Sequence, residues 1–380
     1  MEKQKDLHNK YKRIHCKSIL RMVQWKKFFK EVAILSSTAM IAMSGGVDSS
    51  VAAWLAQQAG FSCIGATMQL LDGSGAEASD AQMIAQRLGM PFHILDMREA
   101  FHRDVMSEFV RCYEAGLTPN PCVICNRRLK FGHLLDAAQA LGCDYIVTGH
   151  YARIIEENGR FHLAKATDPA KDQSYFLYSL NQHQLSHTRF PLGELTKEAA
   201  RSIAEQQGFM NARKKDSQDI CFIPDGDYFS FLKRFTGKEY PTGDFLDMDG
   251  KVVGKHCGAV AYTRGQRKGL GLAMGHPVYV SSKDMEKNTV TVCENQQLFS
   301  TSLLADDWNF FPFDTLTAPI RCKAKARSRM TEQPATVYPE ENGVCRVVFD
   351  EPQRALTTGQ AVVLYDGDKV LGGGTIREVL

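Results

Sequence analysis

MIAMSGGVDSS, residues 40–50, is the stretch of sequence that decides the fold. Its apolar start predicts a buried strand over Thr38–Met43, and its polar second half predicts a turn that leads into a helix over Asp48–Ala59. The two glycines let the backbone approach an anion closely, and the serines add hydroxyl donors. Because a helix N-terminus presents unpaired N–H groups and the positive end of the helix dipole, the stretch predicts a phosphate-binding turn.

Two common nucleotide-binding motifs do not fit this turn. A Walker A loop requires GxxxxGK[ST], but no lysine follows Gly45 and Gly46, and the dinucleotide motif GxGxxG is also absent. The loops that kinases and GTPases use are therefore excluded. A serine–glycine turn that binds no ligand is the alternative explanation.

The composition is that of an ordinary globular protein with more than one domain. At 380 residues, with 44% hydrophobic and 23% charged residues, the chain is long enough for two or three cores. No apolar run is long enough to span a bilayer, and no secretory signal follows the basic first residues. We therefore expect a cytoplasmic protein whose 11 cysteines stay mostly reduced, with a monomer as the simplest assembly.

The chain divides by composition into four segments. Residues 1–37 form a basic extension with 10 Lys or Arg against 3 Asp or Glu, from which we expect no chemistry. Residues 38–215 alternate apolar strand candidates with helical stretches, which is typical of an α/β fold with a parallel sheet. Residues 216–300 contain short glycine-rich elements and predict a small central α+β domain, and residues 301–380 predict a C-terminal β-barrel.

The elements expected in the α/β segment bring several turns together. The strand candidates are Thr38–Met43, Ser62–Met68, Phe92–Asp96 and Tyr145–Thr148, and the helix candidates include Asp80–Leu88 and Arg128–Ala140. Ligands of a parallel sheet bind beyond the carboxyl ends of its strands. The turn after Met43, Met68 itself and the turn Thr148–His150 should therefore meet in one crevice.

Positive charge gathers in two places. Arg264, Arg267 and Lys268 lie in one glycine-rich turn, and five basic residues alternate along one expected strand: Arg321, Lys323, Lys325, Arg327 and Arg329. A strand would place all five on the same face. Contact with RNA and a solvated strand face both explain this stripe, because the net charge of +3 is too small to decide.

Two segments place a cysteine beside basic residues. Thr118–Asn126 reads as a proline-rich turn followed by a helix, so that Cys125 should lie near a helix N-terminus. The segment Lys214–Phe222 places Cys221 close to two lysines. Helix dipoles and nearby cations favour the nucleophilic thiolate form of a cysteine. Two such cysteines suit sulfur transfer, in which one carries a persulfide and the other resolves it, leaving a disulfide that must be reduced.

Metal binding is the alternative for these cysteines. Cys122 and Cys125 have the spacing of half a zinc site, but no second pair at short spacing follows them. Cys122, Cys125 and Cys221 could instead hold three irons of a [4Fe–4S] cluster, with the fourth iron open to a sulfide. The other cysteines stand in apolar or strand contexts and are expected in cores.

The hexapeptide Ser44–Ser49 resembles the PP-loop of the ATP pyrophosphatases, which split ATP between the α and β phosphates and adenylate an oxygen of their substrate. With both cysteine segments in order, the chain from about Met40 onward resembles the tRNA-specific 2-thiouridylases, which thiolate the wobble uridine. Further blocks that carry this resemblance are Thr148–Arg153, Lys171–Leu177, Gly265–Gly271, Val348–Pro352 and Gly359–Val362. The resemblance implies a PP-loop α/β domain, a small central domain and a terminal barrel.

The resemblance also implies roles for single residues. It implies ATP contacts, with Mg2+ helping pyrophosphate to leave, for Ala42, Met43, Ser44, Gly45, Gly46, Val47, Asp48, Ser49, Met68 and Gly149. It implies tRNA contacts for Asn120, Pro121, Cys122, His150, Lys171, Asp172, Gln173, Arg327, Ser328 and Gln360. Cys221 would receive the persulfide, and Cys125 would be its partner. The implied partners are wobble-uridine tRNAs for Lys, Glu and Gln and a persulfide donor such as a cysteine desulfurase or a sulfur carrier.

Three features depart from the family pattern. Cys122 stands where some members have an aspartate proposed as an acid–base group, which excludes a carboxylate base there and favours the cluster. Ser328 stands where an aromatic tRNA-contacting residue is common. Leu70–Asp80 is shorter than the acidic loop usual at this place. Among the implied tRNA contacts, His150 is alternatively a buried histidine that caps its turn, and Lys171–Gln173 an ordinary surface turn.

The expected reaction is ATP-dependent 2-thiolation of the wobble uridine. The C2 carbonyl is a poor electrophile, but adenylation of its oxygen creates AMP as a good leaving group, after which sulfur attacks C2. The base must first leave the anticodon stack, which costs about a few kcal/mol. Two rivals are another PP-loop ligase or synthetase, which needs no paired thiols, and a non-catalytic tRNA-binding protein whose turn is purely structural.

Overall fold

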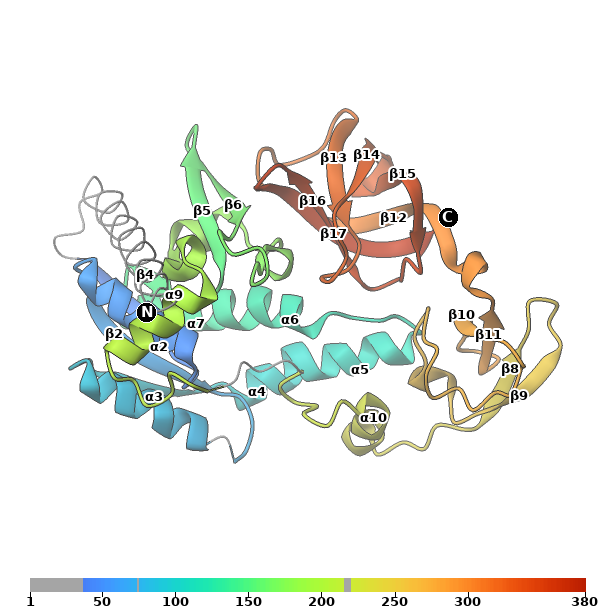
Figure 1. The fold of residues 1–380 in the computed structure, drawn as a ribbon, viewed down its shortest axis with the longest axis horizontal. Coiled ribbons are helices and arrows are strands. Elements are labelled where there is room, and N and C mark those ends of the chain that lie inside the picture. The colour runs from blue at the N-terminus through green and yellow to red at the C-terminus, as the bar shows by residue number, and fades with distance from the viewer. Residues whose placement is uncertain (1–36, 74, 215–219) are drawn as a thin grey trace, which may run out of the picture. The chain divides into compact units, whose positions relative to one another are not determined.

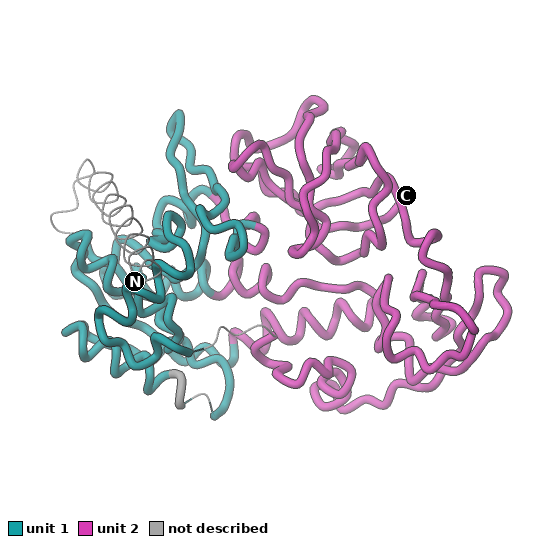
Figure 2. The backbone as a smooth tube through the Cα atoms, in the orientation of Figure 1, with its two compact units in different colours: residues 1–99, 130–174, 182–216 teal, residues 100–129, 175–181, 217–380 magenta. Residues whose placement is uncertain are grey.

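The computed structural model describes residues 37–73, 75–214 and 220–380. Almost all of the expected basic extension and residues 215–219 of the second cysteine segment lie outside these ranges. The described residues within 1–99, 130–174 and 182–216 form unit 1, and those within 100–129, 175–181 and 217–380 form unit 2 (Figure 2). Within the described ranges, no helix is both long enough and apolar enough to cross a membrane.

Unit 1 contains a five-stranded parallel sheet with the strand order β3-β2-β1-β4-β7, which confirms the predicted α/β fold. Its strands are β1 (Thr38–Ala42), β2 (Ser62–Gln69), β3 (Phe92–Asp96), β4 (Tyr145–Val147) and β7 (Thr188–Arg189). The chain moves from β1 outward to β3 and then returns to the other side of β1. The strand order therefore reverses between β1 and β4, and ligands of parallel sheets bind at such a switch point.

Helices flank this sheet (Figure 1). They are α2 (Val47–Gln58), α3 (Gly75–Arg87), α7 (Leu134–Ala140), α8 (Gln182–Ser186) and α9 (Lys197–Gln206). Buried alanines and branched residues of α2, α3 and α9 share one core with β1, so the apolar face of α2 is fixed against the sheet. An antiparallel hairpin of β5 (Ala152–Glu157) and β6 (Arg160–Lys165) completes unit 1.

Unit 2 begins with helices whose aromatic side chains pack together. They are α4 (Arg98–Phe101), the π-helix η1 (His102–Met106), α5 (Ser107–Glu114), α6 (Pro121–Ile124), the π-helix η2 (Cys125–His133) and α10 (Tyr228–Thr236). The first two residues of α4 and the last four of η2 belong to unit 1. Phe109 of α5 meets Phe222 and Phe231 edge to face, at ring-centroid distances of 5.3 and 5.9 Å. These contacts join residues 100–129 to the later part of the chain.

The remainder of unit 2 is built from strands. A four-stranded sheet has the order β10-β11-β8-β9, formed by β8 (Gly243–Leu246), β9 (Val252–His256), β10 (Tyr279–Asp284) and β11 (Thr289–Cys293). Six further strands are β12 (Phe299–Phe310), β13 (Ile320–Lys325), β14 (Gln333–Pro339), β15 (Cys345–Arg354), β16 (Ala361–Asp366) and β17 (Lys369–Val379). Because β12 pairs with both β15 and β17, these six close into the predicted barrel.

Two local predictions need correction. The basic stripe does not follow a single strand, because β13 ends at Lys325 and Arg327 and Arg329 lie in the turn after it. The helix expected to start at Arg128 belongs to a helical segment that already starts at Pro121. Proline is well suited to a first helical position, where its missing N–H costs nothing.

Candidate active site

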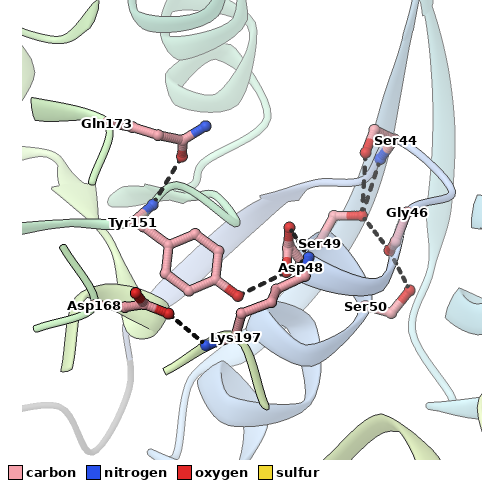
Figure 3. Close-up of polar contacts among 9 residues, drawn as sticks. All are labelled: Ser44, Gly46, Asp48, Ser49, Ser50, Tyr151, Asp168, Gln173 and Lys197. Carbon is pink, nitrogen blue, oxygen red and sulfur yellow. Dashed lines mark hydrogen bonds and ion pairs between the residues drawn. The ribbon is translucent and has the colours of Figure 1, made fainter. Parts of the chain in front are cut away.

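The glycine turn after β1 is held by its own hydroxyl groups (Figure 3). Ser49 Oγ accepts a hydrogen bond from Ser44 N at 3.2 Å and donates one to Gly46 O at 3.0 Å, and Ser50 Oγ donates to the same carbonyl at 2.9 Å. Gly45 adopts a φ of +67°, which strains other residues and suits glycine. The turn thus leads directly into the first N–H groups of α2, as a phosphate-binding turn requires.

Two buried side chains from elsewhere in unit 1 anchor the turn. Asn211 Nδ2 donates to Gly45 O at 3.1 Å and to Ser50 Oγ at 2.9 Å, and Thr67 Oγ1 of β2 donates to Met43 O at 2.5 Å. Asn211 is only 7% exposed, and its Oδ1 has no hydrogen-bond partner among the described residues. The turn is therefore pre-shaped before any ligand arrives.

The acidic residue of the turn is neutralised by a buried lysine. Lys197 Nζ lies 2.8 Å from both carboxylate oxygens of Asp48, and Tyr151 Oη donates to Oδ1 of Asp48 at 2.8 Å. Lys197 is 5% exposed and starts α9, where its backbone N–H donates to Asp168 Oδ2 at 2.9 Å. Because the lysine offsets the charge of Asp48, the positive end of α2 remains available to an anion.

Gly149 follows β4 and packs against the start of α2. A Cβ atom at this position would lie 2.7 Å from Asp48 C and 2.8 Å from Ser49 N, so any larger residue would collide with the helix backbone. Met68 stands one residue before the end of β2, the strand next to β1. The structure therefore brings Met68, Gly149 and the turn to the same edge of the sheet, as expected from the sequence.

The segment Lys171–Gln173 is a tied turn rather than a loose surface loop. Gln173 exchanges two hydrogen bonds with Tyr151, through Oε1 to Tyr151 N and through its own N–H to Tyr151 O, both at 2.9 Å. Asp172 Oδ1 accepts from Ala166 N at 3.0 Å, and its Oδ2 accepts from Ser174 Oγ at 2.7 Å. Nε2 of Gln173 makes no hydrogen bond within the described ranges, so it is available to a ligand.

His150 is half-buried between aromatic rings and a lysine. Its Nε2 lies 3.5 Å from Lys130 Nζ, and its Nδ1 lies 2.7 Å from Thr148 Oγ1. Because an ammonium group can only donate, Nε2 accepts and the proton lies on Nδ1. Burial, followed by the charge of Lys130, holds the pKa of His150 well below its usual 6.5. A neutral imidazole therefore reaches this end of the sheet, within a shell that includes Phe131 and Phe190.

The lowered pKa of His150 predicts a pH dependence of stability. Below about pH 6.5 the unfolded chain binds a proton on this imidazole while the native protein does not, so stability falls as the pH drops. We expect His150→Gln to weaken this fall between pH 7 and pH 5, by at most about 1.4 kcal/mol per pH unit. Urea unfolding at both pH values measures it, and equal slopes for variant and wild type would show that His150 titrates normally.

The cysteines of unit 2 differ in exposure. Cys125 is 9% exposed and buried, whereas Cys122 and Cys221 are exposed. Cys125 is the fifth residue of the helical segment that starts at Pro121, and its backbone N–H is already bonded to the carbonyls of Pro121 and Cys122. Cys122 lies in the first turn, and Cys125, which was expected near the helix N-terminus, lies one turn after Pro121. Cys125 instead begins the π-helix η2, a form that is often found at functional sites.

The barrel holds the segment that precedes α6. Gln360 Nε2 donates to Thr118 O at 2.8 Å and to Pro119 O at 3.4 Å, while Thr118 N donates to Thr358 O at 2.9 Å. A Cβ on Gly359, whose φ is +85°, would lie 2.9 Å from Thr118 N. Gln360 thus lies beside the start of α6, where Asn120, Pro121 and Cys122 are found.

Comparison with known proteins agrees with this arrangement. Family models match over residues 37–225 (tRNA methyl transferase HUP domain), 229–294 (tRNA methyl transferase PRC-barrel domain) and 300–376 (aminomethyltransferase beta-barrel domain). The tRNA-specific 2-thiouridylase MnmA of Clostridium acetobutylicum is 44% identical over 355 residues, covering 90% of this chain and all of that protein. The protein of the same name from Acetivibrio thermocellus is 46% identical, covering 89% of this chain and 98% of that one.

The chain belongs to the tRNA-specific 2-thiouridylase family. This confirms the resemblance drawn from the sequence. Among solved structures, NMN synthetase from Francisella tularensis matches 58% of this chain and 84% of its own, with a TM-score of 0.35 and 16% identity.

A [4Fe–4S] cluster finds no support in this 2-thiouridylase. Within the described ranges, no three His, Cys, Asp or Glu side chains are grouped closely enough to hold a metal ion. Cys122, Cys125 and Cys221 are thus not grouped as a ligand set in this structure, and their role as cluster ligands stays a prediction.

Sequence reasoning missed three residues of the 2-thiouridylase site: Tyr151, Lys197 and Asn211. Tyr151 stands inside the resembling block Thr148–Arg153, which was a signal that could have indicated it. Lys197 and Asn211 stand 149 and 166 residues from the turn positions they contact and lack any local motif. Only the packing of α9 and of the segment after it brings them to the PP-loop.

The exposure of the cysteines predicts an order of chemical modification. We expect iodoacetamide to label the exposed Cys122, Cys221 and Cys257 before the buried Cys125, because the reagent must reach the sulfur. Peptide mass spectrometry after short exposures measures the order. Early labelling of Cys125 would show that the segment around η2 opens in the protein without tRNA.

Proposed function

We propose that this protein catalyses ATP-dependent 2-thiolation of the wobble uridine in tRNA. The observation that carries the proposal is the PP-loop itself, with its hydroxyl-closed turn at the switch point of the sheet, in a chain 44–46% identical to proteins named tRNA-specific 2-thiouridylases. A PP-loop alone fits many adenylating enzymes. The two cysteine segments distinguish this family from ligases that need no thiol.

ATP would bind with its phosphates at the turn Ser44–Ser49. The N–H groups at the start of α2 and the hydroxyl of Ser44 supply donors for phosphate oxygens, while Ser49 Oγ already donates to Gly46 O. Ala42, Met43, Val47 and Met68 line the ends of β1 and β2, and Gly149 leaves space where a side chain would strike α2. The oxygen of the substrate attacks the α-phosphorus, and pyrophosphate leaves.

The donor set at this edge of the sheet fits Mg2+, which prefers oxygen ligands. Because both carboxylate oxygens of Asp48 are bonded to Lys197, the hydroxyl oxygens of Ser44 and Ser49 are the groups of the turn that would hold it. The ion would supply charge neutralisation for the departing pyrophosphate.

Sulfur would pass through the two cysteines of unit 2. An external persulfide donor, a cysteine desulfurase or a sulfur carrier, transfers one sulfur to the exposed Cys221. The terminal sulfur attacks C2 of the adenylated uridine, and AMP leaves with the former O2. Cys125 then attacks the sulfur of Cys221, which releases 2-thiouridine and forms a Cys125–Cys221 disulfide. A dithiol reductant supplies the two electrons that restore both thiols.

The candidate tRNA contacts lie in two places, one in unit 1 and one in unit 2. Gln173 presents a free Nε2 to a base, while Asp172 shapes the turn and Lys171 adds charge. His150 presents a neutral ring. In unit 2, Gln360 anchors the loop that carries Asn120, Pro121 and Cys122, and Arg327 and Ser328 lie in the β13–β14 turn.

Nucleoside analysis of cellular tRNA tests the proposal. Deletion of the gene should abolish 2-thiouridine derivatives in tRNAs for Lys, Glu and Gln while other thiolated bases keep their levels. The purified protein should form 2-thiouridine from an unmodified transcript only when ATP and a persulfide donor are both present. Thiolation that persists in the deletion strain, or formation without ATP, would reject the proposal in favour of a tRNA-binding role.

A further inference from the structure

Three arginines from separate segments of unit 2 come together where the middle sheet meets the barrel. Arg264 precedes β10, Arg327 lies in the turn after β13, and Arg354 ends β15. Arg327 Nη2 donates to the carbonyl oxygens of Arg354 and Ala355. A Cβ on Gly265, the neighbour of Arg264, would lie 3.6 Å from Arg354 Nη1.

The three side chains are oriented by groups that carry no charge. Arg264 Nη1 donates to Ser281 O at 3.0 Å, Arg354 Nε donates to Asn295 Oδ1 at 2.8 Å, and the guanidinium of Arg354 lies 4.9 Å from the ring centroid of Tyr279. Arg264 Nε is buried and has no hydrogen-bond partner within the described ranges. These contacts fix the guanidinium groups without neutralising them.

Among the residues that the structure describes, no carboxylate forms an ion pair with these three arginines. Other arginines of the barrel form ion pairs, as Arg321 does with Asp350 and Arg346 with Glu340, but none of the three pairs with an acidic side chain in the part of the chain that the structure describes. Burial, and then the neighbouring charges of Arg354 and Arg264, lower the pKa of Arg327. Burial also lowers the pKa of Arg264. Since guanidinium groups do not deprotonate in proteins, the cluster stays cationic and self-repelling.

A strained backbone position lies beside the cluster. Ala355 adopts a φ of +50°, which a non-glycine residue rarely does, and it is fully buried beside Leu298. Its N–H donates to Leu298 O at 2.7 Å, and a Cβ on Gly265 would meet its own Cβ at 2.8 Å. Strained positions of this kind persist where the surroundings demand them and gather at ligand sites.

We propose that Arg264, Arg327 and Arg354 form a binding site for one phosphodiester group of an RNA backbone. This inference rests on the proposed function, since tRNA is the anionic partner that it names. Of these three arginines, the resemblance implies a tRNA contact only for Arg327. The structure adds Arg264 and Arg354. Guanidinium groups match phosphate oxygens with paired N–H donors, so one phosphate would relieve the repulsion among the three charges.

The test is the salt dependence of tRNA binding by Arg354→Gln. Each phosphate contact contributes about 0.7–0.9 to the slope of log K against log salt concentration. We therefore expect the variant to bind about tenfold more weakly at 50 mM salt but only about threefold more weakly at 200 mM, with a slope smaller by about 0.8. Cognate and non-cognate transcripts should lose affinity equally, because a phosphate carries no sequence information.

Matched variants separate charge from folding. Arg346→Gln removes an arginine of the same strand that is paired with Glu340, at 2.8 Å, and should leave the slope unchanged. Arg354→Lys should keep most of the slope, and Arg264→Gln should reproduce the loss seen for Arg354→Gln. The KM for ATP should stay constant throughout.

Each contrary outcome overturns this site. An unchanged slope in Arg354→Gln, with wild-type protein still binding and thiolating tRNA, rejects the site and leaves the proposed function intact. A loss that is equal at all salt concentrations and accompanied by a lower Tm shows a folding effect. A raised KM for ATP with normal tRNA binding assigns the cluster to the nucleotide. Wild-type protein that binds no tRNA rejects the proposed function as well.

Discussion

Protein carrying Cys221→Ser is expected to bind tRNA and ATP as wild type does, but its rate of 2-thiouridine formation should fall by at least about 10³-fold. A serine hydroxyl cannot carry a persulfide, so sulfur cannot reach the adenylated base. The side chain is exposed, and its replacement should leave folding unchanged. Single-turnover assays with mass spectrometry of the nucleosides measure the product. Full activity of this variant would show that sulfur reaches C2 by another route.

The Cys125→Ser variant should fail at a different step. Without the resolving thiol, the sulfur on Cys221 attacks C2 and stays bonded to both, so we expect tRNA that remains attached to the protein under denaturing conditions and is released by dithiothreitol. Cys257→Ser, which removes another exposed cysteine, is the matched control and should react normally. Cys122→Ser should retain sulfur transfer, because cluster chemistry, which would need this residue, finds no support in the structure. If Cys125→Ser forms no adduct and keeps full activity, Cys125 is not the resolving thiol.

The parts of the fold that the sequence predicted are those in which local pattern and tertiary structure agree. The strand, glycine turn and helix of residues 38–58 follow one another without a break, so apolar runs and helix-start signals suffice to place them. β3 was predicted to the residue, since polar and turn residues bound it on both sides. The barrel strands were recognisable for the same reason, because alternation and turn residues are local.

What could not be predicted depends on contacts between distant residues. The proline-rich stretch before Cys125 suggested a later helix start, although Pro121 is itself a favourable first residue. Residues 100–129 read as part of an alternating α/β segment, but Phe109 packs on rings from residues 222–231. The π-helix at Cys125 and the three-arginine cluster likewise arise from packing, which no periodicity in a single sequence encodes.

Asp48 is paired with Lys197, so we expect the second large loss of activity in the variant Lys197→Met. The variant leaves a carboxylate that is 31% exposed without its ammonium partner, beside the place where the polyphosphate would bind. Stranding such a charge costs about 2–3 kcal/mol after allowance for its partial exposure. We expect kcat/KM for ATP to fall about 10- to 100-fold, mainly through a higher KM, because the uncompensated carboxylate repels ATP more than it disturbs the bound complex.

The division between KM and kcat separates this electrostatic role from a purely structural one. A variant that only folded less well would lose active protein and lower the apparent kcat, while the KM for ATP stayed constant. Arg213→Gln is the control, because it removes a cation from an exposed pair with Glu205 at 3.7 Å near the same helix and should change neither constant. Unfolding measurements on Lys197→Met, Asp48→Asn and the double variant should be non-additive, since removing the carboxylate also removes the stranded charge. Additive losses of unfolding free energy, or an unchanged KM for ATP in Lys197→Met, would mean that Lys197 only stabilises α9. The PP-loop would then not depend on the charge of Lys197.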